Sequence, residues 1–215
     1  MKSKLIGLGL ASMVGAASVS AAELEVTVTN VTRGTIFTPI LVVSHSSGLD
    51  LFEPGQPAGD ELSALAEGGD TGPLAEKLAE DSRFVDSASS GGLLLPGESV
   101  TVKVDAPSRR SRVSLAAMML PTNDGFIALN GVDTPMLNRT LTYHANGYDA
   151  GSEPNDELCA NIPGGGGCEG EGGSPGVGGE GHVHVHNGIH GSGDLSPAAY
   201  DWKNPVAHIS IKKVK

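Results

Sequence analysis

The chain has 215 residues, which is one domain by length or two at most. It carries 14 Lys and Arg residues against 25 Asp and Glu residues, a formal net charge of −11, which excludes a protein that follows nucleic-acid phosphates with a basic face. The 31 glycines disfavour a helix-rich architecture, because each glycine inside a helix costs about 1 kcal/mol relative to alanine. The composition therefore indicates strands and long loops.

The segment before the first acidic residue predicts export. Two lysines precede an apolar, uncharged run that ends in small residues, which is the order of a secretory signal peptide. The run is shorter than the roughly 20 apolar residues that a membrane-spanning helix needs, and no later segment is long and apolar enough. We expect residues 1–22 to be a signal peptide, removed after Ala21 or Ala22, and residues 23–215 to form one secreted or periplasmic domain.

The remaining chain alternates between apolar and polar residues, which predicts strands. Residues 24–31 (LEVTVTNV) give a clear alternation, and Pro39 predicts an edge or a bulge in the strand that contains it. Residues 112–120 are more fully apolar, which predicts a central strand. Eight candidate strands result, over residues 24–31, 36–44, 99–104, 112–120, 126–129, 139–143, 182–186 and 206–214.

Short helices are expected in one insertion between strands. Residues 60–67 predict a helix with Asp60 as its N-cap, and residues 73–81 predict a second helix with Pro73 in the first turn. Eight strands with helices confined to one insertion predict an all-β fold, an eight-stranded antiparallel β-sandwich with a short helical insertion. We expect the glycine-rich residues 164–193 to be a long ordered loop of this domain, because a further strand follows them.

The chain has two cysteines, Cys159 and Cys168. In an exported protein such a pair predicts a disulfide, since oxidising compartments keep disulfides formed. The alternative interpretation, a thiolate metal site, lacks the second cysteine pair of a zinc finger. On the loop-length argument the disulfide would stabilise the fold by roughly 2–3 kcal/mol.

Acidic residues in two loops form a candidate calcium site. Asp124 lies in the loop PTNDG, and Asp149 and Glu153 lie in the loop YDAGSE that follows another strand. Ca²⁺ takes six to eight hard oxygen ligands in flexible geometry, and carboxylates from loops at one end of a sandwich supply such ligands. The alternative is that these residues only shape turns, because Asp and Gly dominate turns without any metal.

A histidine-rich segment is a second candidate metal site. His182, His184 and His186 alternate, so that on a strand all three imidazoles would point to one face, and His190 follows in the next turn. Two or three of them could hold Zn²⁺ or Cu²⁺, or the segment could be a half-exposed strand whose histidines only pack and form hydrogen bonds. The chain has neither a G-x-S-x-G nucleophile motif nor a phosphate-binding loop, so we expect no enzyme activity.

The two acidic motifs resemble those of the spondin amino-terminal domain family, known from F-spondin and mindin. The motifs are LPTNDGFI at residues 120–127 and YDAGSE at residues 148–153, and the resemblance in strand order runs from about residue 24 to residue 213. The segments GVGGEGHVHVHNGIHGSGDL and YDWKNPVAHISI look like the bacterial branch of this family. The resemblance implies an antiparallel β-sandwich similar to calcium-dependent lipid-binding domains.

The resemblance also implies a ligand set. In animal members one calcium ion is held by the aspartate of the first motif and by the first and last acids of the second, which correspond here to Asp124, Asp149 and Glu153. Two positions depart from the family pattern, because Gly125 separates Asp124 from the aromatic Phe126 and Glu153 replaces an aspartate. Ca²⁺ tolerates the longer glutamate better than Mg²⁺ would. The implied protein is a non-catalytic adhesion module that binds one Ca²⁺ and an extracellular protein or glycan.

A second hypothesis belongs to a different class. An exported sandwich with one disulfide and a His-x-His segment also fits a periplasmic copper- or zinc-binding protein that uses the cluster His182–His190, with an activity like that of copper–zinc superoxide dismutase. In that enzyme the other histidine ligands come from separated segments, and here only His45, His144 and His208 are left for that role. Metal analysis of the purified protein separates the two hypotheses.

Overall fold

A computed structural model describes residues 22–106, 111–136, 138–173 and 178–214, so the expected signal peptide lies outside the described residues apart from Ala22. Within these ranges the strands are β1 Ala22–Asn30, β2 Ile36–Phe37, β3 Leu41–His45, β4 Phe84–Ser89, β5 Ser99–Ala106, β6 Arg112–Leu120, β7 Gly125–Asp133, β8 Thr140–Asp149, β9 His184–Val185 and β10 Ala207–Lys213. The helices are α1 Asp60–Gly68, α2 Gly72–Ala79, α3 Pro197–Tyr200 and the 3₁₀-helix η1 Cys159–Asn161. The prediction of an all-β fold with a small helical insertion is confirmed.

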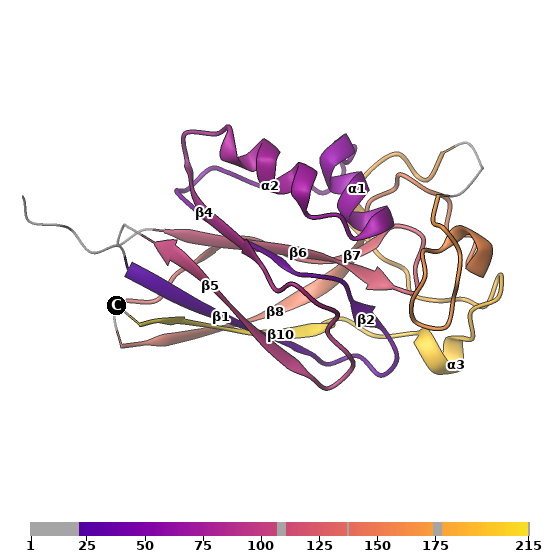
Figure 1. Cartoon of the computed structure of the whole chain (residues 1–215). Helices are drawn as coiled ribbons and strands as arrows, with labels where there is room; N and C mark the ends of the chain where they lie inside the picture. The colour runs from indigo at the N-terminus through magenta and orange to yellow at the C-terminus, as the bar shows by residue number, and fades with distance from the viewer. Residues whose placement is uncertain (1–21, 107–110, 137, 174–177, 215) are drawn as a thin grey trace, which may run out of the picture.

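The strands form an antiparallel sheet that is folded into two layers (Figure 1). The strand order is β4-β3-β6-β7-β8-β10-β1-β5, with β2 paired to β6 and β9 paired to β8. β8 belongs to both layers, because residues 140–145 pair with β10 and residues 146–149 pair with β7. Because β8 changes its partner, its last residue, Asp149, lies in the layer of β7, at the end of that layer.

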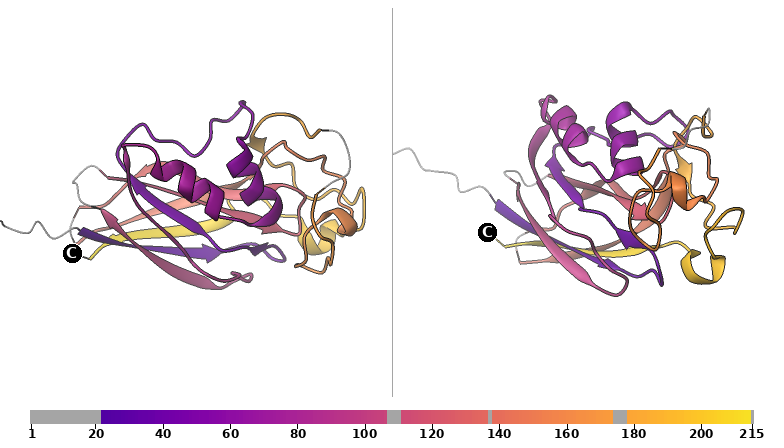
Figure 2. Two further views of the ribbon diagram at one scale, coloured as in Figure 1. Left: turned by 45° about the horizontal axis from the view of Figure 1, so that its top comes forward. Right: turned by 45° about the vertical axis from the view of Figure 1, so that its right-hand side comes forward.

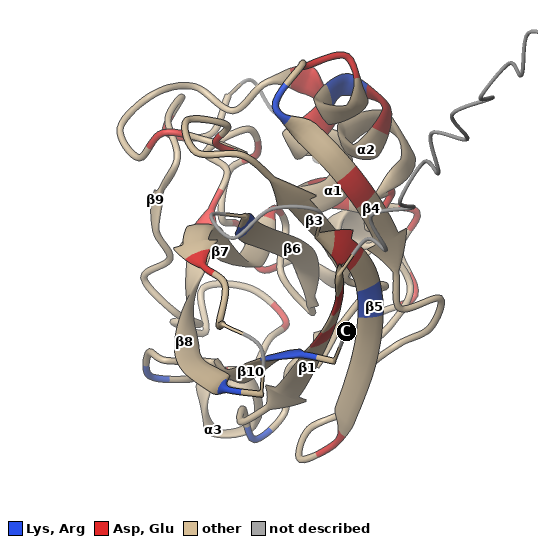
Figure 3. Ribbon diagram, turned by 90° about the vertical axis from the view of Figure 1, so that its left-hand side faces the viewer, with Lys and Arg blue, Asp and Glu red and all other residues tan. Residues whose placement is uncertain are grey.

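The two ends of the strand order meet. β4 and β5 lie side by side (Figure 3), and the backbone N–H of Asp105 on β5 donates to Asp86 Oδ2 on β4 over 2.8 Å. The Ser44 hydroxyl on β3 donates to the Asp105 carbonyl. These bonds close the sandwich into a near-barrel. The same view shows acidic positions more often than basic ones, as the negative net charge requires.

Two apolar clusters stabilise this arrangement. The first lies between the layers and includes Leu24, Val26 and Val28 of β1, which alternate with half-buried polar residues as the sequence pattern predicts. The second lies between the helices and the outer face of β3, β6 and β7, where α1 and α2 cover the sheet (Figure 2). β6 is buried along both faces except at Arg112, which explains its continuous apolar run and confirms that it is central.

Some elements differ from their predicted form. The strand expected over residues 36–44 is split into β2 and β3 around Pro39, because proline has no N–H for the ladder. The expectation that Asp60 is the N-cap is wrong, since Gly59 occupies that position and Asp60 is the first helical residue. β4 was not expected, because its sequence FVDSAS lacks a clear alternation, with five half-buried residues followed by the exposed Ser89.

Candidate metal centre

The pairing of β7 with β8 brings the two acidic motifs together. Gly125 lies opposite Asp149, and Phe126 lies opposite Tyr148. The rings of Phe126 and Tyr148 stack with centroids 5.7 Å apart, and Phe52 packs edge-on against both at 5.3 and 5.0 Å. Such aromatic contacts add to the strand pairing. The aromatic cluster therefore fixes the ends of two strands, and with them Asp124 and Asp149.

Asp124 is completely buried and only half satisfied. Its Oδ2 accepts hydrogen bonds from the backbone N–H of Ser152 at 2.8 Å and of Glu153 at 3.0 Å, and from the Ser152 hydroxyl at 3.2 Å. Its Oδ1 is buried without a hydrogen-bond partner among the described residues. Burial, and after it the charge of Asp149, raises the pKa of Asp124 to about 7. The site thus contains a buried carboxyl oxygen that faces no donor.

Asp149 is also completely buried. Its Oδ1 accepts a hydrogen bond from the Gly151 N–H at 2.7 Å, and its Oδ2 accepts one from Asn155 Nδ2 at 2.6 Å. Two imidazoles lie just outside hydrogen-bond range, with His184 Nδ1 3.8 Å from Oδ1 and His186 Nε2 3.9 Å from Oδ2. Asp149 is therefore the point at which the acidic motifs and the histidine-rich segment meet.

Glu153 contributes its backbone to the site, since its N–H donates to Asp124. Its side chain is buried, and Oε1 lies close to Gly173. The residues whose possible ligand atoms all lie within 4.8 Å of one another, in the described part of the chain, are Asp149, Glu180 and His184. Whether Asp124, Asp149 and Glu153 share one cation remains a prediction. Glu180 was missed because it lies in a glycine-rich stretch that gives no strand or helix signal.

The histidine-rich segment is arranged differently from the expected strand. β9 covers only His184 and Val185. The rings of His182 and His184 are adjacent, with centroids 5.3 Å apart, whereas His186 is buried against Trp202 at 4.9 Å. The three imidazoles therefore do not share one exposed face, because the chain leaves the strand after Val185 and turns inward.

The remaining histidines lie away from this segment. His45 is buried, and its two ring nitrogens pair with the Ser46 carbonyl and the Ser114 hydroxyl, both at 2.8 Å. His144 and His208 face each other across β8 and β10 with ring centroids 5.4 Å apart. In the described residues none of these three joins a group of metal-binding side chains. The arrangement that the superoxide dismutase-like hypothesis needs is not found there.

Two glycines permit the close approach of the segments around Asp149. A Cβ on Gly125 would lie 2.6 Å from Thr122 Oγ1 and 3.0 Å from His186 Cδ2. Gly151 has φ +67°, and a Cβ there would lie 2.4 Å from the His182 carbonyl oxygen. Side chains at either position would push the histidine-rich segment away from Asp149. A glycine at position 125 is thus what allows the His186 ring to approach.

The loops beside the site are held by covalent and charged contacts. The predicted disulfide between Cys159 and Cys168 is confirmed. Glu157 accepts hydrogen bonds from the backbone N–H groups of three consecutive residues, His190 at 2.6 Å, Gly191 at 2.7 Å and Ser192 at 2.9 Å. These contacts join the segment after Asp149 to the segment after the histidines.

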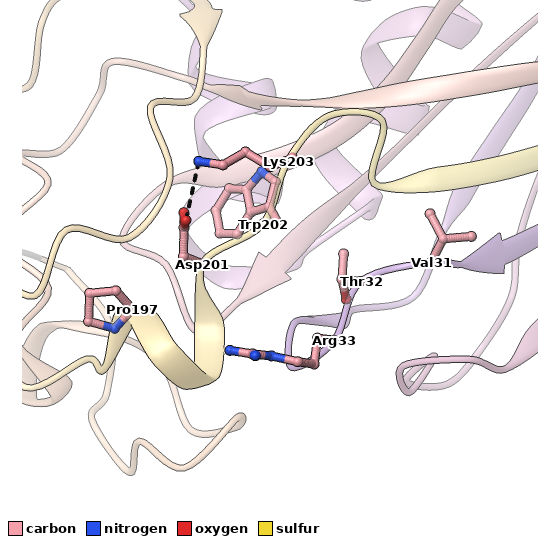
Figure 4. A pocket seen from close by; sticks show the side chains of 7 residues that line it. All are labelled: Val31, Thr32, Arg33, Pro197, Asp201, Trp202 and Lys203. Carbon is pink, nitrogen blue, oxygen red and sulfur yellow. Dashed lines mark hydrogen bonds and ion pairs between the residues drawn. The ribbon is translucent and has the colours of Figure 1, made fainter.

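Two hollows lie near these loops. A small pocket of about 110 Å³ has Asn155, Glu180 and His186 in its wall, and the side chains of Asn155 and His186 lie beside Asp149. A larger groove of about 420 Å³ is lined by residues near α3 and the end of β1, where Arg33 and the ion pair of Asp201 with Lys203 lie around Trp202 (Figure 4). Trp202 separates the groove from His186, since its ring also packs on that imidazole. The groove mixes both signs of charge, whereas the small pocket borders the carboxylates.

Comparison with known proteins gives one family. The sequence profile of the family described as Spondin_N matches residues 30–154, which include both acidic motifs. No curated protein sequence matches the chain. In the described residues no helix has the length and apolar character needed to cross a membrane.

Proposed function

Because the chain belongs to the spondin amino-terminal domain family, we propose that it is a secreted or periplasmic, non-catalytic binding module whose loops are held by one Ca²⁺ ion. Residues 1–22 would be removed on export, and residues 23–215 would form the working domain. The disulfide supports an oxidising compartment. The partner would be an extracellular protein or glycan, bound in cell-surface or matrix adhesion.

The observation that carries the calcium proposal is the unpartnered Asp124 Oδ1 beside Asp149. Two buried carboxylates so close to each other are unfavourable when both are ionised, and a divalent cation removes that penalty. The donors available from Asp124, Asp149 and Glu153 are hard oxygens, which suit Ca²⁺. Asp124 and Glu153 are not in the group whose possible ligand atoms all lie within 4.8 Å of one another, so a shared ion would have to draw their carboxylates toward Asp149. Burial, and after it the charge of Asp149, raises the pKa of Asp124 to about 7, and a bound cation would compensate the charge of the ionised carboxylate.

The ion would act by joining segments. Asp124 precedes β7, while Asp149 ends β8 and is followed by the turn that contains Glu153. A cation held by all three would pin this turn against the β6–β7 loop and stabilise the folded state by mass action. Its expected effect is on the order of 2.7 kcal/mol when calcium is present at a hundred times its dissociation constant.

Thermal unfolding with calcium or with a chelator tests this proposal. We expect calcium to raise the midpoint of the wild-type protein and of Glu76→Gln, a control that removes an exposed acid on α2 outside both acidic motifs. The midpoint of Asp124→Asn should respond much less. If millimolar calcium left the wild-type midpoint unchanged, the proposal of a calcium site would be wrong, while the proposal of a non-catalytic binding module would still stand.

A further inference from the structure

We propose that Asp149, Glu180 and His184 form a second cation site, which takes a first-row transition-metal ion such as Zn²⁺ rather than Ca²⁺. The inference goes beyond the proposed function and shares only Asp149 with it. Its starting point is geometric, because the possible ligand atoms of these three residues all lie within 4.8 Å of one another. Asp149 is buried, His184 is half-buried and Glu180 is exposed, so the site opens from the protein interior toward solvent.

The donor set selects the ion. Imidazole nitrogen suits Zn²⁺, Cu²⁺ and Ni²⁺, whereas Ca²⁺ prefers oxygen ligands alone. His184 Nδ1 lies 3.8 Å from Asp149 Oδ1 and 3.2 Å from the His182 carbonyl oxygen. Because that carbonyl only accepts hydrogen bonds, a proton on Nδ1 would leave the Nε2 lone pair for a metal. A metal-bound histidine usually donates its second ring N–H to a carbonyl or carboxylate in this way.

The two carboxylates are held next to each other by one amide. Asn155 Nδ2 donates to Asp149 Oδ2 at 2.6 Å and lies 3.4 Å from Glu180 Oε1. The 110 Å³ pocket is lined by Glu180 and by Asn155, whose amide contacts Asp149, so the pocket reaches the edge of this group. A pocket at the edge of the group and a bridging donor are both features of a site that can be loaded after folding.

A second observation points to a ligand at this place. The His186 side chain is only 3% exposed, and its Nε2 has no hydrogen-bond partner in the described structure although it lies 3.9 Å from Asp149 Oδ2. Its Nδ1 accepts the Gly188 N–H at 2.9 Å, so the ring proton is on Nε2. His186 is therefore a positioning residue and not a ligand, with an N–H that can donate to Asp149 or to a water on the ion.

Metal titration of the tag-free mature protein tests the site. Zn²⁺ binding is measured by calorimetry and by equilibrium dialysis with metal analysis, in saturating Ca²⁺. We expect one Zn²⁺ per chain at this site, and at least tenfold weaker binding in His184→Gln and in Glu180→Gln. The Ca²⁺ affinity of these two variants should stay within about twofold of wild type. His144→Gln, which removes an exposed imidazole on β8 that does not belong to this group, is the matched control and should keep its Zn²⁺ affinity.

Two further variants separate this site from the proposed calcium site. Asp124→Asn should weaken Ca²⁺ and not Zn²⁺, and Asp149→Asn should weaken both. Failure of Ca²⁺ binding with intact Zn²⁺ binding would overturn the calcium proposal alone. Failure of wild type to bind Zn²⁺, stoichiometric displacement of Zn²⁺ by Ca²⁺, or equal losses in His144→Gln and His184→Gln would overturn the second site.

The positioning role of His186 has its own readout. His186→Gln keeps an N–H donor and should retain most of the Zn²⁺ affinity, whereas His186→Leu should lose it and change the visible absorption spectrum of the Co²⁺-loaded protein. Circular dichroism and Ca²⁺ binding check that both variants fold. Equal behaviour of the two folded variants would contradict the role assigned to the ring N–H.

Discussion

Two buried carboxylates in the same group of loops differ in how many hydrogen bonds their two oxygens accept. Glu157 has both oxygens occupied, Oε1 by one backbone N–H and Oε2 by two. Asp124 has three donors on Oδ2 and none from the described residues on Oδ1. A carboxylate that is saturated by backbone donors holds a loop in place, while one with an unpaired buried oxygen has capacity for a ligand.

The backbone reinforces this contrast. Glu157 has φ 56°, a left-handed conformation that is unfavourable for a residue with a Cβ. The three hydrogen bonds of its side chain offset that strain, which explains why a glutamate rather than a glycine fits here. Asp124, by contrast, precedes a regular strand and is placed by the β7–β8 pairing. Glu157 therefore stabilises the conformation of its own loop, whereas the position of Asp124 is set by the sheet.

The strongest test of the contrast is the pH dependence of the metal-free protein. A folded-state pKa of about 7 for Asp124 lies above its unfolded value, so the stability linked to its protonation is present at acidic pH and is lost as the pH rises through 7. Relative to Asp124→Asn, the free energy of unfolding of wild type should fall by up to about 4 kcal/mol between pH 4 and pH 8. Urea unfolding in chelator measures this difference. If the free energies of unfolding of wild type and of Asp124→Asn changed with pH in the same way, Asp124 would not differ from a saturated carboxylate.

Glu157→Gln tests the saturated carboxylate. The glutamine NH2 group cannot accept a hydrogen bond, so at least one of the three backbone N–H donors loses its acceptor. The free energy of unfolding should therefore fall by about 3 kcal/mol. The loss should be the same with calcium and with chelator, since Glu157 has no free oxygen for an ion. Denaturant unfolding in both conditions checks this, and a loss confined to the calcium-bound protein would assign Glu157 to the metal site instead.

The double substitution of Cys159 and Cys168 by serine tests the loop that follows Glu157. Removing the bond that closes a loop of sequence separation 9 should lower the free energy of unfolding by roughly 2–3 kcal/mol. Calcium affinity, measured by calorimetry, should change little, because neither cysteine is among the hydrogen-bond partners of the Asp124 and Asp149 side chains in the described residues. A large drop in affinity would show that the disulfide loop and the half-satisfied acids are one unit.

Asp149→Asn should change the free energy of unfolding least of the four substitutions, and the sign of the change should depend on calcium. Without calcium the loss of repulsion with Asp124 is offset by one lost hydrogen bond, because the asparagine amide can accept from only one of the Gly151 N–H and Asn155 Nδ2 donors, so the free energy of unfolding should change by no more than about 1 kcal/mol. With calcium it should be less stable than wild type, because a charged ligand is lost. Thermal unfolding in both conditions gives the two signs. Equal effects in both would indicate that Asp149 is an ordinary turn residue.

The sequence predicted those parts of the site that depend on regular structure. The aromatic–acid pairs around Phe126 and Tyr148 could be placed at strand ends from the alternation of their neighbours, and the pairing of those strands then brings Asp124 and Asp149 together. The buried run of β6 could be assigned for the same reason.

Glu157 and Glu180 could not be found in this way. Both lie in irregular segments whose positions depend on backbone contacts between distant glycine-rich stretches, such as the approach of Gly151 to His182. No periodic pattern encodes such contacts. The prediction of a strand over residues 182–186 was wrong for a related reason. The alternation of histidine and valine predicts five paired residues, whereas only His184 and Val185 pair with β8.

The contact between β4 and β5 has a consequence for how this protein can assemble. Strands at the border of a sheet carry unpaired amides and carbonyls that another chain can extend, which is the usual start of fibre formation. Here the two outermost strands of the path cover each other through Asp86, Ser44 and Asp105. The N–H and the carbonyl of Asp105 are occupied by these contacts, and the borders formed by β4 and β5 lie against each other, which disfavours the addition of a strand from another chain there.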